Sequence, residues 1–285
     1  MKVNKKGHAL SLAAGIASIA FLSSGAKAQT VAAWNFENDA IAVNNSPAQS
    51  SGSATGTAGS IGMNIYPTTT VGVTTDDVLQ GASGDTGTNG VADLTQTWRI
   101  RAQNAAGTAN GWSSLAPIGT QGATFAASTV GYSNIKVAFD WYATNQGEAN
   151  LQLEYTTDGT HFTNIPIVNS GGSSDVAILT NSTSSNTVTG TYAQITGGQQ
   201  WAPDLTATIS DPAAANDPNF AIEMVNASMG ADCISAKGTA LNNDSGNWRF
   251  DNVVISGTAV PEPASLSLLA LGAMGLAARR RRASR

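Results

Sequence analysis

The middle of the chain shows the clearest alternation of apolar and polar residues. In residues 135–142 the polar side chains Lys136, Asp140 and Tyr142 fall on even positions, with Ala138 between them. The side chains on the odd positions are Ile135, Val137, Phe139 and Trp141. Successive side chains of a strand point to opposite faces, so this pattern predicts a strand with one apolar face.

A second alternating segment follows and predicts the partner of a hairpin. Residues 151–156 place Leu151, Leu153 and Tyr155 on one face and polar residues on the other. Asp158-Gly159 comes next, and glycine accepts the positive φ that a tight turn requires. We therefore expect the chain to turn there and to return as a strand from His161 onward.

The rest of the chain contains short β-prone runs separated by polar residues, with no convincing amphipathic helix and no repeat of fixed length. Loops are expected in the polar segments 44–60, 81–90 and 169–186. Further strands are expected at 31–37, 61–66, 71–79, 97–103, 187–195, 205–209, 219–225 and 247–255. This order predicts an all-β fold, an antiparallel jelly-roll-like β-sandwich with its first and last strands adjacent.

Two of these segments resemble parts of known jelly-roll domains. Residues 154–162 resemble a hairpin phrase common in jelly rolls of exported bacterial proteins, and residues 247–255 resemble the closing strand of carbohydrate-binding jelly rolls. Such domains often use Ca²⁺ to join the first strand to the last. The resemblance implies Glu37 and Asp251 as ligands of a structural calcium ion, although both could equally be surface carboxylates.

The N-terminus has the three parts of a secretory signal peptide. Three lysines in the first six residues precede an apolar stretch at 9–22. Ala26 and Ala28 then form a small-x-small cleavage site, so that cleavage leaves Gln29 first. This pattern predicts export through the Sec machinery.

The C-terminus combines a Pro-Glu-Pro sequence, an uncharged segment at 264–278 and a basic end. The residues concerned are Pro261, Glu262 and Pro263, and then Arg279, Arg280, Arg281 and Arg282. This tail resembles the PEP-CTERM sorting signal of Gram-negative bacteria that make exopolysaccharide. The resemblance implies processing by the membrane protease exosortase at Pro-Glu-Pro, with the arginines remaining on the cytoplasmic side.

The apolar segment is shorter than a full membrane span. Its length of about 15 residues compares with the roughly 20 that a transmembrane helix needs. An ordinary C-terminal anchor or a buried helix is therefore the alternative to a recognition helix. The expected organisation is a signal peptide at 1–28, a β-sandwich at 29–259 and the sorting signal at 260–285.

Removing the two ends changes the charge of the protein. The full chain has a formal net charge of −5, but the part between Thr30 and Val260 contains only five Lys and Arg residues against eighteen Asp and Glu. An acidic body disfavours nucleic acid and anionic lipid as partners. It is compatible with divalent cations, with cationic partners or with solubility outside the cell.

Few residue types for catalysis remain in this body. His161 is its one histidine and Cys233 its one cysteine, which excludes an intramolecular disulfide and a zinc site of several histidines or cysteines. Glycoside hydrolysis needs only two carboxylates. Asp140, Glu154 and Glu223 lie on expected strands and could face one groove, although solvated carboxylates are the usual pattern on a sandwich.

Sugar binding would require exposed aromatic rings beside polar groups. Trp112, Tyr132 and Trp201 lie in expected loops and are the candidates. The alternative is that such rings fold back over the sandwich core.

These observations favour a non-enzymatic envelope or exopolysaccharide-matrix protein that acts as a surface module or a glycan-binding module. The tail would attach it to the membrane until the protein is sorted. A carbohydrate-active hydrolase with paired carboxylates is the second hypothesis, and a purely structural matrix component is the third.

Overall fold

The computed structural model describes residues 27–37, 46–62, 64–65, 78–79, 97–101, 112–183, 186–242 and 246–260. These residues form two antiparallel sheets packed face to face, with two short 3-10 turns, η1 (Pro212–Ala214) and η2 (Gly230–Asp232). The signal sequence up to residue 26, the Pro-Glu-Pro sequence and the basic end lie outside the described residues.

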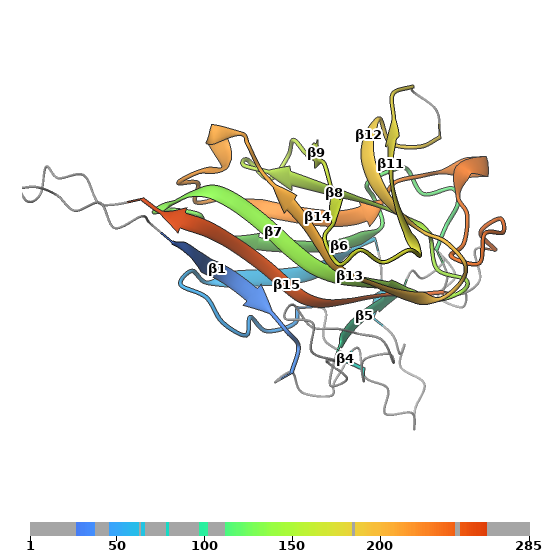
Figure 1. Ribbon diagram of the computed structural model, residues 1–285, viewed down its shortest axis with the longest axis horizontal. Helices are drawn as coiled ribbons and strands as arrows, with labels where there is room; N and C mark the ends of the chain where they lie inside the picture. Colours follow the sequence, from blue (N-terminus) through green and yellow to red (C-terminus); the bar gives the residue numbers. More distant parts are fainter. Residues whose placement is uncertain are drawn as a thin grey trace, which may run out of the picture.

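The first sheet has the order β10-β13-β7-β15-β5-β3, with β1 also paired to β15 and β4 to β5. Its strands are β1 (Ala28–Trp34), β3 (Asn64–Ile65), β4 (Val78–Leu79), β5 (Thr97–Arg101), β7 (Tyr132–Ala143), β10 (Val168–Asn169), β13 (Gln200–Thr208) and β15 (Trp248–Ala259). The long strands β7 and β15 lie side by side through the middle of the molecule (Figure 1).

The second sheet has the order β11-β12-β8-β14-β6-β2, with β9 paired to β8. Its strands are β2 (Gly56–Ile61), β6 (Gly122–Ala127), β8 (Asn150–Thr156), β9 (Thr163–Ile165), β11 (Val176–Asn181), β12 (Gly190–Ile195) and β14 (Ala221–Asn226). The predicted antiparallel sandwich is therefore confirmed.

Aromatic side chains fill the space between the sheets. Phe125 of the second sheet packs edge-on against Trp34, Trp98 and Phe250 of the first, with ring centroids 5.1, 5.8 and 6.2 Å away. Edge-to-face packing at these separations is favourable for aromatic rings and adds to the burial of their large apolar surface. The predicted apolar face of residues 135–141 also lies in this core.

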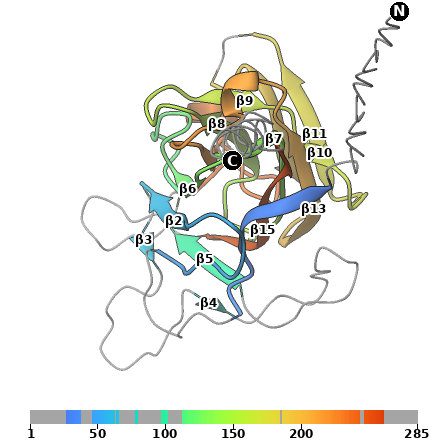
Figure 2. The ribbon, with the colours of Figure 1, turned by 90° about the vertical axis from the view of Figure 1, so that its left-hand side faces the viewer.

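The first strand pairs with the last along the length of β1, as predicted. Ala28 lies opposite Thr258 and Trp34 opposite Val253. Strand β1 runs beside β15 in both views of the ribbon (Figures 1 and 2). The start of the described sandwich therefore lies next to its end.

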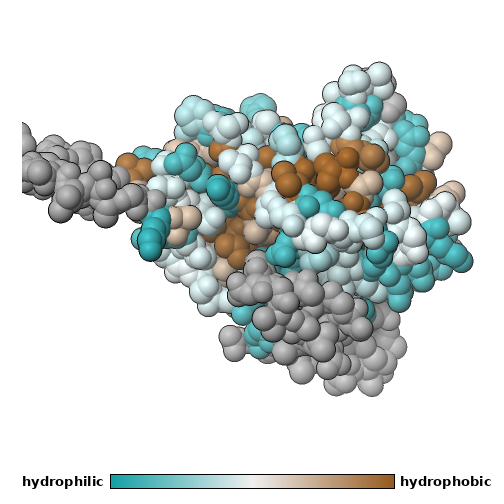
Figure 3. Space-filling view, viewed as in Figure 1, coloured by the Kyte–Doolittle hydropathy of each residue, from teal (hydrophilic) through white to brown (hydrophobic). Residues whose placement is uncertain are grey.

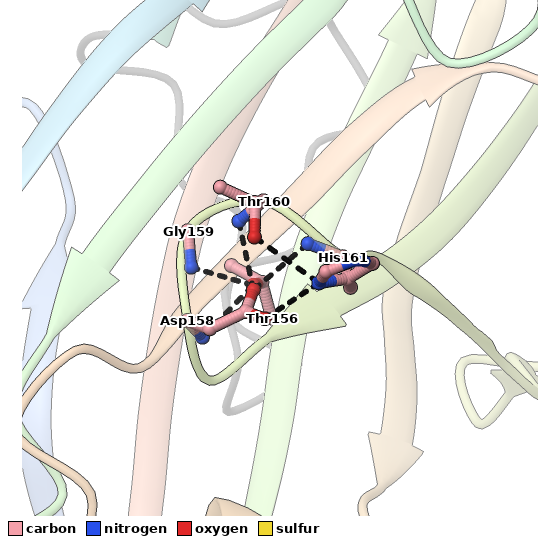
Figure 4. A network of polar contacts seen from close by, with 5 residues as sticks. All are labelled: Thr156, Asp158, Gly159, Thr160 and His161. Atoms are coloured by element: carbon pink, nitrogen blue, oxygen red, sulfur yellow. Dashed lines mark hydrogen bonds and ion pairs between the residues drawn. The ribbon is translucent and has the colours of Figure 1, made fainter.

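The predicted hairpin is also present, but its loop is longer than a two-residue turn. Glu154 pairs with Asn164, and β9 begins at Thr163. The Asp158 carboxylate accepts hydrogen bonds from the backbone N–H groups of Thr160 and His161, both at 2.8 Å (Figure 4). Gly159 has a φ of 74°, in the left-handed region that glycine adopts readily. This agrees with the interpretation of Asp158-Gly159 as a turn.

Two segments predicted as loops contain strands. Val176–Asn181, inside the expected loop 169–186, forms β11 and pairs with β12, with Val176 buried opposite Ile195. Gly56–Ile61, within and just beyond the expected loop 44–60, forms β2. Both predictions were wrong because cross-strand pairing outweighs the weak local preference of polar and small residues.

Among the described residues, no helix has the length and apolar character needed to cross a membrane. The surface shown in Figure 3 is mostly pale or teal, with apolar surface in separate patches.

Candidate functional site

The outer face of the second sheet brings together two glutamates from different strands. Glu154 of β8 and Glu223 of β14 are direct cross-strand partners, and Thr124 of β6 is the partner of Glu223 on its other side. Gln152 lies two residues before Glu154 on the same face of β8, because Leu151, Leu153 and Tyr155 point into the core. We call Thr124, Gln152, Glu154 and Glu223 the carboxylate face.

The pKa values of both carboxyl groups on this face are raised, so each group keeps its proton to a higher pH than an exposed glutamate does. Burial raises the pKa of Glu154 to about 7, and the negative charge of Glu223 raises it further. Burial likewise raises the pKa of Glu223 to about 7, with a hydrogen bond from Thr124 acting in the opposite direction. Removal from water disfavours the charged form, and a second carboxylate nearby adds repulsion.

The segment from Ser113 to Gln121 accounts for part of this burial. A Cβ atom added to Gly119 would lie 3.5 Å from Gln152 Nε2 and 3.6 Å from Glu154 Oε1, so its backbone passes over both side chains. Gln152 is 2% exposed and Glu154 9%. Gln152 and Glu154 are therefore partly dehydrated, although they lie on the outside of a sheet.

Positive charge is absent from the sequence around the pair. None of the seven strands of the second sheet contains a lysine or an arginine, and neither does the segment 113–121. Arg249 lies on the first sheet, where its guanidinium carbon is 4.9 Å from the centre of the Tyr142 ring. The charge of Glu154 and Glu223 thus has no basic partner on their own sheet.

Asp140, the third predicted carboxylate, lies on the other sheet and does not face this pair. It is completely buried on β7, opposite Asp251 of β15. Its Oδ1 accepts the Asp204 N–H at 2.6 Å and its Oδ2 accepts the side-chain amide of Asn252 at 2.9 Å. Asp204 and Asn252 lie in the irregular parts of β13 and β15, so Asp140 joins two bulges across one strand.

The three aromatic residues expected in exposed loops are placed differently. Trp112 is 1% exposed and packs on Trp248, with ring centroids 4.1 Å apart. Trp201 lies on β13, not in a loop, and it is buried against Tyr142 at 5.2 Å. Burial removes the open ring faces that stacking on a sugar needs, and for Trp112 the packing agrees with the alternative in which loop rings cover the core.

Tyr132, the third of these residues, begins β7 and is partly buried against the core. Its hydroxyl lies 2.6 Å from Ser53 Oγ. This contact joins the side chain of Tyr132 to the segment that follows β1. The structure does not bring Tyr132 into one cluster with Trp112 and Trp201.

The two residues predicted to hold calcium lie near the same end of the β1–β15 pair. Glu37 follows β1 in a turn, whereas Asp251 is completely buried and accepts the N–H of Asn252 at 2.7 Å. Within the described ranges, no group of three or more His, Cys, Asp or Glu side chains could hold a metal ion. Calcium binding by Glu37 and Asp251 stays a prediction.

The single histidine and the single cysteine of the body lie in different surroundings. His161 is exposed in the β8–β9 turn, and its Nδ1 is 2.6 Å from Asp158 Oδ2. Cys233 is buried directly after η2, and burial raises the pKa of its thiol to about 12, which keeps it protonated. Neither arrangement provides an activated nucleophile.

Sequence reasoning missed two aromatic residues, one beside the carboxylate face and one exposed in the β8–β9 loop. Tyr192 shares the outer face of the second sheet, because its neighbour Ala193 points into the core opposite Leu151. Phe162, just before β9, is 39% exposed. The alternation of residues 190–195 could have indicated the position of Tyr192, but only the pairing of β12 with β8 places it beside this face.

Comparison with protein families gives a match at the C-terminus. A model described as the PEP-CTERM protein-sorting motif matches residues 259–282. The chain ends in a PEP-CTERM sorting motif. This confirms the resemblance drawn from Pro261, Glu262, Pro263 and the four arginines. The motif marks an exported protein that exosortase processes and that is anchored at the membrane before processing.

Comparison with curated proteins gives no match. The solved structures that match include the following two. One contains the CBM22-1 and GH10 modules of a Clostridium thermocellum endo-1,4-beta-D-xylanase in complex with xylohexaose, at 12% identity and a TM-score of 0.26, over 64% of the present chain and 25% of the other. The second is the N-terminal cellulose-binding domain of Cellulomonas fimi beta-1,4-glucanase C, at 12% identity and a TM-score of 0.27, over 61% and 87%. Overlaps this weak say nothing about what the present chain binds.

Proposed function

We propose that the sandwich is a non-catalytic module that binds glycan through the carboxylate face after export, at the cell surface or in the exopolysaccharide matrix of a Gram-negative bacterium. The supporting observation is the arrangement of hydrogen-bonding side chains on strands, with Glu154, Glu223 and Thr124 crossing three neighbouring strands in one row. Sugar hydroxyls need donors and acceptors in fixed positions, and strands hold such groups more precisely than loops do.

The charge state of the pair also suits a neutral ligand. A protonated carboxyl group donates one hydrogen bond and accepts others, whereas a carboxylate only accepts. Because the pKa of each group is about 7, its protonated and ionised forms are both present near neutral pH. Tyr192, on the same outer face of the sheet, is the aromatic residue that would stack on a pyranose face.

Hydrolysis is the second candidate, because the structure does pair two of the predicted carboxylates. Glycosidases assign different roles to their two carboxyl groups, and the environment separates the two pKa values. Here Glu154 and Glu223 share one environment, and burial raises the pKa of both to about 7. Because burial acts on both groups in the same direction, these surroundings do not assign one carboxyl group as the acid and the other as the nucleophile or base, which favours binding over catalysis.

The test uses the full-length chain in detergent on a glycan array, with a reducing-sugar assay on every glycan retained. Binding without product, weakened about tenfold in Thr124→Val and unchanged in Thr208→Val, supports the proposal. Thr208 is the matched control because it is exposed on the first sheet. Product formation that Glu154→Gln or Glu223→Gln abolishes would identify a hydrolase, and no retention on any glycan would favour a structural matrix component.

A further inference from the structure

Two glutamates in direct cross-strand register, without a basic residue on their sheet, form an unfavourable arrangement unless something neutralises them. Like charges that face each other destabilise a sheet, and partial burial strengthens the repulsion. A proton on one or both groups relieves the repulsion in acid. At higher pH the same oxygen atoms are suited to a cation.

Gln152 supplies an independent observation that points to a ligand. Its side chain is 2% exposed, and its Nε2 donates a hydrogen bond to Glu154 Oε2 at 3.1 Å, so the amide lies against Glu154. The amide oxygen Oε1 is buried without a hydrogen-bond partner. A buried carbonyl oxygen without a partner costs free energy, and a bound cation would satisfy it.

We propose that Gln152, Glu154 and Glu223 form a binding site for a divalent cation of the calcium type on the outer face of the second sheet. All three groups offer oxygen atoms, which hard cations prefer, and the hydroxyl of neighbouring Thr124 is a fourth oxygen on the same face. Ca²⁺ accepts bidentate carboxylates, an amide oxygen and water molecules in variable geometry, whereas Mg²⁺ requires a near-ideal octahedron. This site is separate from Glu37 and Asp251, which lie by the first sheet.

The proposal does not depend on glycan binding, because the ion can be measured with no sugar present. Ca²⁺ would compete with protons for Glu154 and Glu223, so binding should strengthen between pH 5.5 and pH 8. The nearby elements add few other titratable groups. Tyr192 lies on β12 with Asp232 beside it, Asp158 and His161 lie beyond the end of β8, and no titratable residue occurs in β2, β6, β9 or the segment 113–121.

Isothermal titration of the full-length chain in detergent with calcium chloride tests this inference. We expect this site to bind one ion at pH 8, with a dissociation constant of roughly 10⁻⁴–10⁻³ M, the range of extracellular calcium modules. Titrations at pH 7 in buffers of different ionisation enthalpy should show protons released on binding, a signature that needs no variant. Binding that is equally strong at pH 5.5 and pH 8 would contradict the proposal, as would the absence of both heat and a melting-temperature shift at pH 8.

Matched variants locate the ion. Glu154→Gln and Glu223→Gln should each weaken binding at least about tenfold, while Glu37→Gln, the same change at the other predicted site, should leave it unaltered. Near-UV circular dichroism without calcium shows whether each variant is folded. Loss of binding in Glu37→Gln alone would place the ion at the β1–β15 end and overturn the proposal, whatever the result for glycan.

Discussion

Glu148 is a glutamate that the sandwich buries almost completely, just before β8. Ser228 Oγ donates a hydrogen bond to its Oε1 at 2.8 Å, and the N–H of Asn150 lies 3.2 Å from the same atom. Burial outweighs these bonds and raises the pKa of Glu148 to about 8. The side chain is therefore mainly protonated at neutral pH, in the folded protein but not in the unfolded chain.

The sign of the resulting pH dependence follows from proton binding. Between the unfolded pKa of about 4.5 and the folded pKa of about 8, the native state holds a proton that the unfolded state has lost. The contribution of Glu148 is therefore fully present below pH 4.5 and is lost as the pH rises through 8, a total fall on the order of 5 kcal/mol.

We expect Glu148→Gln to reduce this fall, because glutamine has the shape of the protonated acid without its titration. Urea unfolding at pH 5 and pH 8 measures the difference, with exposed Asp175→Asn as the control. Folding also raises the pKa values of Glu154 and Glu223, so these groups too lower the stability as the pH rises. Part of the fall in stability should therefore remain in the variant. An unchanged fall in Glu148→Gln would contradict the pKa shift.

Asp140 illustrates a second residue whose role depends on its surroundings. Asp140→Ala would leave the Asp204 N–H and the Asn252 amide without this acceptor, so we expect a loss of about 1–3 kcal/mol in the free energy of unfolding. Asp140→Asn, which keeps one oxygen acceptor, should lose less. Chemical denaturation measures both, and a loss of stability no larger than that of exposed Asp175→Ala would exclude a role in joining the bulges.

At the scale of elements, the β8–β9 hairpin shows how a short local signal survives in the folded protein. The Asp158 carboxylate accepts two backbone N–H groups and lies against His161, and these contacts hold its pKa well below the usual range. Thr156 Oγ1 accepts the Gly159 N–H at 2.9 Å. All of these partners lie within six residues, so the turn forms from local contacts.

Gly159→Val should destabilise the protein by about 1–2 kcal/mol, because a β-branched residue is strained at φ of 74°. A Cβ atom at this position would meet nothing within 4 Å, so the cost comes from the backbone alone. Gly159→Asn is the matched control, since asparagine tolerates the left-handed region better. Thermal unfolding should rank the wild type above Asn and Asn above Val, and equal stability of the two variants would contradict the argument.

At the scale of the whole molecule, the pairing of β1 with β15 brings the two ends of the sandwich together. Ala28, the predicted last residue of the signal peptide, lies opposite Thr258, and the sorting motif begins at residue 259. Both processing steps would then act at one end of the folded body. The rest of the surface would remain available to ligands.

Mass spectrometry of protein recovered from the envelope and from the medium should find Gln29 at the N-terminus and no residue beyond the Pro-Glu-Pro region at the C-terminus. Replacing Arg279 to Arg282 with glutamine should cause the precursor to accumulate, because these positive charges orient the tail. A C-terminus that includes Arg285 in the released protein would contradict processing at this motif.

The sequence alone determined the features that depend on local order along the chain. Period-two alternation at 135–142 and 151–156 predicted which side chains enter the core, since strand geometry fixes that relation. The Asp-Gly turn and the sorting tail could be recognised for the same reason, because each is a contiguous pattern. The six residues 176–181 could not, because small and polar residues form a strand only where a partner strand offers its hydrogen bonds.

Only the tertiary structure decided what the polar residues do. Asp140, Glu154 and Glu223 look alike in the sequence, yet cross-strand register pairs two of them on one sheet and buries the third between bulges of the other. Burial of Trp112 and Trp201 likewise depends on which rings lie opposite them. Charge, pKa and exposure result from contacts between residues far apart in the chain, and for that reason the carboxylate face could be located only in the folded protein.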